Sequence, residues 1–464
     1  MGKHRGGDPA KSLRFANKAR ELYMEGLTKY PHNLDLAYNK ARLELEIATH
    51  PQFTRVLELA PRTVLTWSLT SHEHALTIAP DNADLLFNTA QVLTTLAEED
   101  SKEDTVSLET TLNRLARAVE YQHKCCHLQE VQFNENQEQL ERAARAIDED
   151  EDGGVKLDSR LPDSEVPSQW VSIVEPVTTE TLVDTLLALL NTLTVTCNIM
   201  NSVLSAGTTA ETTFSSLSVQ VETKSQKVIQ GRLAELTRQD LSQEQLLEIE
   251  LSKANLASAL LETAYRMQHI NLEQYRQTRD LAFARAMLVH NHPSFAVADA
   301  NSLISLNAAA SVDMTPPIEN TASRWNALSK AQTLLAQAAQ SPGLAADSDA
   351  LAKTHFTRGN ISLSLHALAL PPIEYAQART NKDQLLRNAE IFYRNASRLC
   401  PDSTDTDVAK LRSIVARSLS DQLDTRTFHS DVLLTEIQTQ MTRRDVRWIR
   451  HQLEDLVDEG LIPD

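Results

Sequence analysis

The amino-acid sequence predicts an all-α protein assembled from repeated helical segments, and three observations support this. Glycine is scarce, with 11 residues in 464, which is well under half of the usual ~7 %. Aromatic residues make up only 5 % of the chain, and Leu and Ala dominate the apolar set, which favours helices over strands. The phrase "PHNLDLAYNKA" begins at Pro31 and returns 49 residues later as "PDNADLLFNTA" at Pro80. A fixed spacing of this kind indicates a repeat architecture.

The segment before each phrase carries a common frame: a small residue, a ring four positions later, a small residue three positions after that, and then proline. The small residues allow a second helix to approach closely, and the ring fills the space beside them. Proline then ends the helix, because it cannot continue the hydrogen-bond ladder. The frame is formed by Ala19, Tyr23, Gly26 and Pro31, by Ser68, His72, Ala75 and Pro80, and again by Ala389, Tyr393, Ala396 and Pro401.

Each phrase also predicts the start of the next helix. An asparagine can cap its first turn, and an aspartate two positions later lies where the helix dipole favours negative charge. An alanine further along provides a position of close approach to a neighbouring helix. These three roles belong to Asn33 and Asn82, to Asp35 and Asp84, and to Ala41 and Ala90.

The pattern resembles the tetratricopeptide repeat (TPR) family, most clearly over residues 14–98 and fairly over 325–402. Gly359, within "HFTRGNIS", stands at the family's Gly/Ala position on the helix before Ala389. A looser candidate frame consists of Ala331, Leu335 and Ala338 ahead of Pro342. The period of 49 departs from the family's 34. The resemblance implies a TPR-like solenoid of antiparallel helix pairs with long, irregular repeats.

Composition predicts the domain organisation. Five consecutive acids, paired glycines and two prolines occur in "DEDEDGGVKLDSRLPDSEVPSQ", which predicts an acidic flexible linker over 148–169. We therefore expect N-terminal TPR-like repeats over 1–147 and C-terminal repeats over 170–464. The second part should contain a TPR-like unit near 350–402 and a terminal capping helix over 443–459.

One apolar segment requires a membrane test. No charged residue occurs between Thr185 and Ala210, and a spanning helix needs roughly 20 mostly apolar residues. On a helix the segment has an apolar stripe and, on the other side, a polar one, so we expect an amphipathic helix buried in the protein rather than a membrane span. The apolar stripe contains Leu182, Leu186, Leu189, Leu193, Cys197, Met200 and Leu204; the polar one contains Asn191, Thr194, Asn198 and Asn201.

Catalytic and metal-binding patterns are weak. The sequence has neither a glycine-rich phosphate loop nor a G-x-S-x-G nucleophile elbow. In "HKCCH", residues His123, Cys126 and His127 are the best metal candidates, but no fourth ligand can be named. Four cysteines are too few for a disulfide framework, and the polar start of the chain is not a secretory signal. We therefore expect no enzyme activity, no cofactor and no metal, in a protein of the cytosol or nucleus.

Charge constrains the partners. The net charge is −18 and the pI is about 5.3, which opposes binding to a nucleic-acid backbone. Basic residues gather at 3–20 and at 443–450, and each group is interpreted as a solvated helix face.

Stacked helix pairs expose a groove that typically binds proteins or peptides. In TPR domains that bind acidic chaperone tails, groove asparagines act together with Lys and Arg. Asn39 and Asn88 match those asparagines, whereas Asp35 and Asp84 stand where that clamp carries Lys. The charge at these two positions is opposite to that of the clamp. The resemblance therefore implies that the four residues bind a partner other than an acidic tail, and a basic partner fits their charge.

Three hypotheses follow from the sequence. The first is a non-catalytic scaffold or adaptor for protein–protein interaction. The second is a dedicated holding chaperone for a basic client such as a ribosomal protein, and the third is a permanent subunit of a larger complex. Under each of them, the alternative for the four groove residues is that they only cap and join neighbouring helices.

Overall fold

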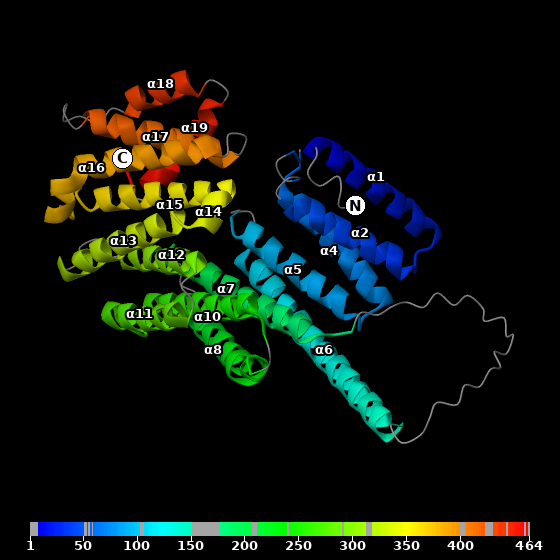
Figure 1. Cartoon of the computed structure of the whole chain (residues 1–464). Helices are drawn as coiled ribbons and strands as arrows, with labels where there is room; N and C mark the ends of the chain where they lie inside the picture. The colour runs from blue at the N-terminus through cyan, green and yellow to red at the C-terminus, as the bar shows by residue number, and fades with distance from the viewer. Residues whose placement is uncertain are drawn as a thin grey trace. The chain divides into compact units, whose positions relative to one another are not determined.

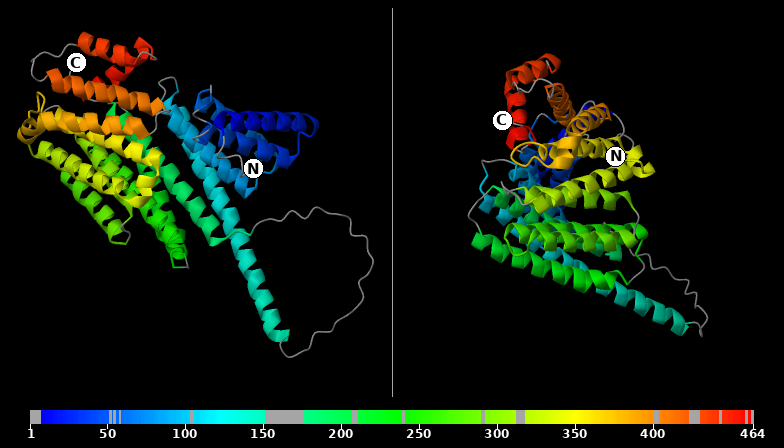
Figure 2. Two further views of the ribbon diagram at one scale, coloured as in Figure 1. Left: turned by 45° about the horizontal axis from the view of Figure 1, so that its top comes forward. Right: turned by 90° about the vertical axis from the view of Figure 1, so that its left-hand side faces the viewer.

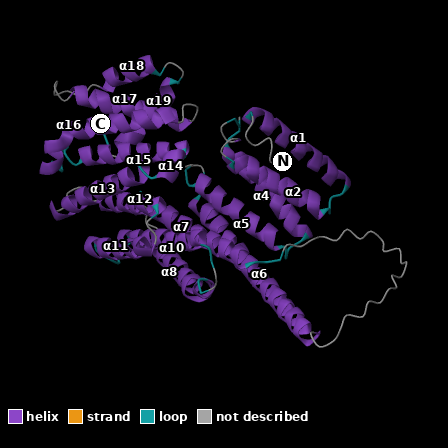
Figure 3. Cartoon of the chain, in the orientation of Figure 1, coloured by secondary structure: helices purple, strands orange, loops and turns teal. Residues whose placement is uncertain are grey.

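A computed structural model shows the chain as α-helices and turns, without a β-strand among the residues that it describes (Figure 3). The predicted all-α helical repeat is confirmed. The structure describes residues 8–462 except 51–52, 54–55, 58, 103–105, 151–175, 207–210, 239–240, 290–291, 312–317, 400–403, 423–429, 442–443 and 459–460.

The chain forms two compact units. The N-terminal unit comprises residues 1–199 and 220–249, and the C-terminal unit comprises 200–219 and 250–464. The first unit thus includes residues on both sides of the predicted linker, of which positions 151–169 lie outside the described residues.

The N-terminal unit contains the two copies of the repeated phrase (Figure 1). Three helices, α7, α8 and α10, contribute residues to both units. The helices from the start of the chain to α10 are α1 (Pro9–Lys29), α2 (Leu34–Thr49), α4 (Pro61–Ile78), α5 (Ala83–Asp100), α6 (Leu108–Asp150), α7 (Thr179–Ser205), α8 (Glu211–Lys227), η2 (Val228–Arg232), α9 (Leu233–Leu236) and α10 (Gln243–Arg266).

The predicted helix starts are confirmed. The Leu36 N–H donates to Asn33 Oδ1 at 2.9 Å, and the Leu85 N–H donates to Asn82 Oδ1 at 2.9 Å. The two side chains therefore satisfy backbone donors that the first turns of α2 and α5 would otherwise leave without a partner.

The repeat consists of helix pairs, in which α2 packs on α4 and α5 packs on α6. Because α2 ends at Thr49 and α4 begins at Pro61, the long connection between them accounts for much of the excess of the 49-residue period over the 34 residues of a TPR. Phe53 and Leu57 of this connection pack against the apolar cluster between the two helices, so the insertion contributes to the core.

The frame residues lie at the contact within each pair. Ser68 and His72 of α4 are fully buried, as is Ala41 of α2. The Ser68 hydroxyl donates to the carbonyl oxygen of Ala41 at 3.1 Å. The small side chains of Ser68 and Ala41 allow the backbones of α4 and α2 to approach each other closely, as the sequence predicts.

A partial copy of the frame, without its proline, occurs in α6, where sequence analysis did not find it. Ala118, Gln122 and Cys125 have the same spacing and are all buried, and Ala118 packs against Ala90 of α5. The α5–α6 pair therefore repeats the α2–α4 pair, with a glutamine at the ring position.

The later part of α6 extends beyond the helices that pack on its beginning (Figure 2). Leu140 is 64 % exposed. Arg142 pairs with Glu138 at 2.7 Å, one turn earlier in the same helix. Such i,i+4 pairs support a helix that has few tertiary contacts.

The C-terminal unit repeats the architecture. Its closest helix pair is α15–α16, and α12 packs similarly on α13. The predicted terminal helix over 443–459 is present as α19. The helices after α10 are α11 (Leu272–Val289), α12 (Pro293–Ala310), α13 (Ile318–Ala339), α14 (Pro342–Ala346), α15 (Ser348–Ala367), α16 (Ala376–Leu399), α17 (Thr404–Gln422), α18 (Ser430–Gln440) and α19 (Val446–Asp458).

The α15–α16 contact centres on a glycine and a tyrosine. A β-carbon on Gly359 of α15 would lie 2.5 Å from the ring of Tyr393 on α16, so the backbone of α15 is in contact with that ring. The Tyr393 hydroxyl donates to Asn360 Oδ1 at 2.7 Å. The Gly359 position that was identified by resemblance therefore packs against the ring of the frame.

Helix α7 contains the uncharged segment examined for a membrane span as far as Ser205. It is long and apolar enough to cross a membrane, but 67 % of its most apolar window is buried inside the structure. A buried core helix passes the same test, so this helix is weak evidence for membrane insertion.

Candidate protein-binding groove

Helices α2, α5 and α7 each present a line of residues at spacings of three and four, polar except for Ala188 on α7, which places each line on one side of its helix. We call this surface the inner face. It consists of Asp35, Asn39, Arg42, Glu46 and Thr49 on α2, of Asp84, Asn88, Gln91, Thr95 and Glu98 on α5, and of Asp184, Ala188 and Asn191 on α7.

A cavity of about 330 Å³ is lined by part of each line, toward the ends of α2 and α5 that lie away from Asp35 and Asp84. Thr49 contributes to its wall from α2, Gln91 and Glu98 from α5, and Ala188 and Asn191 from α7. The three helices therefore border a single depression within the N-terminal unit.

The floor of this cavity is polar and internally hydrogen-bonded. The Thr94 and Thr192 hydroxyls lie 2.9 Å apart, which joins α5 to α7. Gln122 Nε2 donates to Thr192 Oγ1 at 2.9 Å from α6. All three side chains are buried, so this network fixes the relative positions of the helices below the inner face.

The predicted site residues occupy two different settings. Asp35 and Asn39 are exposed, and Asn39 Nδ2 donates to the backbone oxygen of Asp35 at 2.7 Å. Asn88 is half-buried, and its Nδ2 lies 3.5 Å from the hydroxyl of Tyr38 on the neighbouring helix. The structure thus brings Asn88 to α2, whereas the amide of Asn39 bonds within its own helix.

Tyr38 connects the two copies of the phrase, and sequence analysis missed it. Burial raises the pKa of its phenol, and the negative charge of Asp84 raises that pKa further. Arg42 and the Asn88 hydrogen bond act in the opposite direction. The carboxylate of Asp84 therefore acts electrostatically across the gap between α5 and α2.

Two further carboxylates of the inner face were also missed. Burial raises the pKa of Asp184, with a smaller effect in the same direction from Glu180. Burial likewise raises the pKa of Glu98. The spacing of Asp184, Ala188 and Asn191 equals that of the aspartate, asparagine and Gln91 on α5, so the sequence did contain a signal for α7.

Negative charge dominates the inner face. Arg42 is the one cationic residue in the set defined above, whereas each of the three helices contributes at least one carboxylate. Partial desolvation, which the raised pKa values of Glu98 and Asp184 indicate, strengthens the interaction of a carboxylate with a cation, because it lowers the local dielectric constant. The surface is chemically suited to lysine and arginine side chains.

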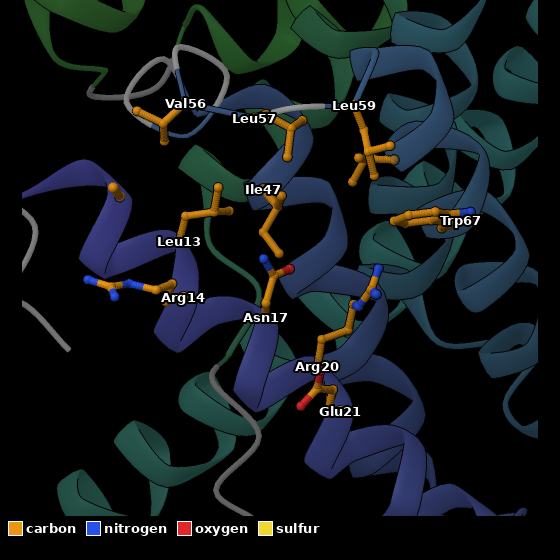
Figure 4. A pocket seen from close by; sticks show the side chains of 12 residues that line it. Leu13, Arg14, Asn17, Arg20, Glu21, Ile47, Val56, Leu57, Leu59 and Trp67 are labelled. Atoms are coloured by element: carbon orange, nitrogen blue, oxygen red, sulfur yellow. The ribbon is translucent and has the colours of Figure 1, made fainter.

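A second, larger cavity of about 530 Å³ lies beside α1 (Figure 4). Its α1 wall is polar and contains Asn17 and Arg20, while Leu57 belongs to the apolar wall opposite. The Arg20 guanidinium carbon lies 4.6 Å from the centroid of the Trp67 ring. No residue of α1 is fully buried, and Leu13 and Ala16 pack against the apolar cluster of α2 and α4 as partly buried side chains.

The "HKCCH" segment does not form a metal-binding cluster. Cys126 is buried, whereas His123 and His127 are exposed. Burial raises the pKa values of the Cys125 and Cys126 thiols to about 12, which keeps both neutral at pH 7. Within the described part of the chain, no three His, Cys, Asp or Glu side chains are placed to hold a metal ion.

Comparison with known proteins gives a short local match. No protein-family model matches the chain. The chain is 40 % identical over 91 residues to UPF0656 protein C926.02 of Schizosaccharomyces pombe. The match covers 20 % of this chain and 20 % of the relative, so the chain matches about one fifth of the relative's length.

Proposed function

We propose that this protein is a non-catalytic scaffold of the TPR-like type, which binds a basic segment of a partner protein along its inner face. The observation that carries the proposal is the set of carboxylates on the inner face: Asp35 on α2, Asp84 and Glu98 on α5, and Asp184 on α7. Of these, Glu98 also lines the cavity. A segment rich in Lys and Arg would complement their charge, and the polar cavity floor would accept hydrogen bonds from it.

Glu98 and Asp184 are exposed side chains, but their raised pKa values indicate partial desolvation, which favours a basic partner over general surface charge. A partly desolvated carboxylate gains more from a bound cation than a fully solvated one does. The same chemistry suits a holding chaperone for a basic client such as a ribosomal protein. It also suits a permanent subunit of a complex, and the two differ in whether the partner is released.

The test measures binding of a Lys/Arg-rich peptide to the full chain by fluorescence anisotropy. The double variant Asp35→Lys with Asp84→Lys should bind at least about tenfold more weakly at low salt, and the difference should shrink as salt rises. The matched control is Glu135→Lys with Glu138→Lys, which changes the charge equally on the exposed part of α6.

Two outcomes would contradict the proposal. If the inner-face and control pairs weaken binding equally, the peptide responds to net charge alone. If the inner-face pair binds as tightly as wild type while circular dichroism shows an intact fold, the two aspartates serve only to stabilise helix starts.

A further inference from the structure

Helix α1 occupies the position of the second helix of a pair, but the described chain contains no helix before it. In the other copies the frame helix packs on its predecessor, as α4 does on α2 and α16 on α15. Helix α1 instead packs on the helix that follows it, α2. The side of α1 that corresponds to the contact within a pair is therefore open.

The equivalent positions of the three frame helices show this directly. Phe15 lies four residues before the first small residue of its frame, as do Val64 in α4 and Leu385 in α16. Val64 is 1 % exposed and Leu385 is 8 % exposed, whereas Phe15 is 63 % exposed. The same side chain position is thus core in two helices and solvent-exposed in α1.

The position three residues after the first small residue of the frame gives the same result. In α4 it is Ser71, whose hydroxyl donates to Glu44 of α2 at 2.6 Å. In α16 it is Phe392, which has the Arg358 guanidinium of α15 4.0 Å from its ring centroid. In α1 it is Leu22, which is 57 % exposed. Contacts from a preceding helix are therefore present in both other copies and absent from the described part of α1.

The charges beside this open side indicate the chemistry of its occupant. Lys11 and Lys18 lie one turn before Phe15 and Leu22, and Lys29 lies two turns after Leu22; all three lysines are exposed. Glu25 offsets part of their charge. A second copy of α1 would bring these lysines close to one another, which is unfavourable. An acidic helix would pair with them.

We infer that the open side of α1 binds an acidic amphipathic helix of a partner protein, which packs on α1 as α2 packs on α4. The occupant needs an apolar stripe to cover Phe15 and Leu22. It also needs Gly or Ala opposite Tyr23, as Gly359 lies opposite Tyr393. Asp or Glu beside the stripe would pair with the lysines of α1. This surface and its charge are distinct from those of the inner face.

The probe is a synthetic peptide of the α2 sequence, residues 34–49, made acidic by Lys40→Glu and Arg42→Glu. It retains Ala41, the small residue that α2 presents to the frame of α4. The full chain should bind this peptide saturably, one to one, and more weakly as salt rises from about 50 mM to about 500 mM. The unmodified α2 peptide should bind at least about tenfold more weakly.

The protein variants compare two exposed apolar residues of one helix. Leu22→Lys should weaken peptide binding at least about tenfold, whereas Met24→Lys should change it less than about twofold, because position 24 faces away from Leu22 on the helix. Met24 is 50 % exposed, so both variants should fold. A peptide with the additional change Ala41→Leu should lose binding, because the larger side chain prevents close approach to Tyr23.

Three results would overturn the inference. The first is the absence of saturable binding of the acidic peptide to the wild-type chain. The second is an equal loss of binding in the Leu22→Lys and Met24→Lys variants. The third is a dimer in light scattering that Leu22→Lys dissociates, which would assign this side of α1 to a second copy of the chain.

Discussion

The ring of Tyr393 occupies the space that a side chain on residue 359 would need. A β-carbon built on Gly359 would lie 2.5 Å from Cε1 of that ring and 2.7 Å from Cδ1. The ring is also held by two other residues of α15: Phe356, in an edge-to-face contact with centroids 5.5 Å apart, and Asn360, which accepts its hydrogen bond. A larger residue at 359 can therefore be accommodated only by moving α15 away from α16.

The first prediction is that Gly359→Ala destabilises the protein by about 1–3 kcal/mol, the usual cost of overpacking a core. Gly343→Ala is the matched control, because a β-carbon there meets nothing within 4 Å. This control should leave stability unchanged or raise it by up to about 1 kcal/mol. Urea unfolding followed by circular dichroism measures both, and equal effects would show that the Gly359–Tyr393 contact is not tight.

The second prediction concerns the buried ion pair of Arg279 and Asp299. Both side chains are essentially inaccessible to water, and burial lowers the pKa of Arg279 to about 10. Asp299→Asn leaves the buried guanidinium without this counter-charge and should cost about 3 kcal/mol. Asp280 also pairs with Arg279 but is 39 % exposed, so Asp280→Asn should cost less than about 1 kcal/mol. Similar losses in the two variants would contradict the assignment.

The third prediction concerns acid stability. Burial lowers the pKa of His366 from 6.5 to about 4, so the folded protein holds this ring neutral while the unfolded chain protonates it. The contribution of this neutral ring to the free energy of unfolding is fully present above pH 6.5 and is lost as the pH falls toward 4. It amounts to about 3 kcal/mol at most. His366→Leu should flatten this part of the stability profile, whereas the exposed His32→Gln should not.

Thermal unfolding between about pH 7 and about pH 4.5 provides the measurement. His72 and His355 also have lowered pKa values through burial, so only the difference between wild type and variant reports on His366. Parallel profiles for wild type and His366→Leu would refute the prediction.

The fourth prediction is that a basic peptide binds less tightly as the pH falls. Protonation removes negative charge from the inner face, and burial raises the pKa values of Glu98 and Asp184. Loss of affinity should therefore begin at a higher pH than ordinary carboxylates would give. Asp184→Asn should reduce this pH dependence, and Glu138→Gln on α6 should leave it unchanged. A pH profile that is the same for all three proteins would exclude a role for Asp184.

Local sequence patterns were sufficient to predict the helix pairs. The asparagine caps, the small residues at helix contacts and the packing of Gly359 against a ring each follow from spacing and residue size. These features depend on neighbours within one or two helices. The copy in α6 was missed because Gln122 replaces the ring, and its amide instead bonds to Thr192, which lies 70 residues further along the chain.

The inner face could be predicted only in part. The sequence identified the repeated aspartates and asparagines, but the contribution of α7 depends on how that helix packs beside α5. Nothing near Tyr38 in the sequence indicates that Asp84 acts on it from 46 positions away. The partial desolvation that raises the pKa values of Glu98 and Asp184 likewise results from tertiary packing, so these shifts could not have been inferred from neighbours in the sequence.

The contacts that hold each helix pair together join residues that are close in the chain. Ser68 and Ala41 are 27 residues apart, and Tyr393 and Asn360 are 33 residues apart. Closing loops of this length costs little additional entropy, and folding is faster when contacts are local. Several pairs can therefore nucleate independently, with no single obligatory nucleus. During synthesis, the α2–α4 pair can form while later helices are still being made.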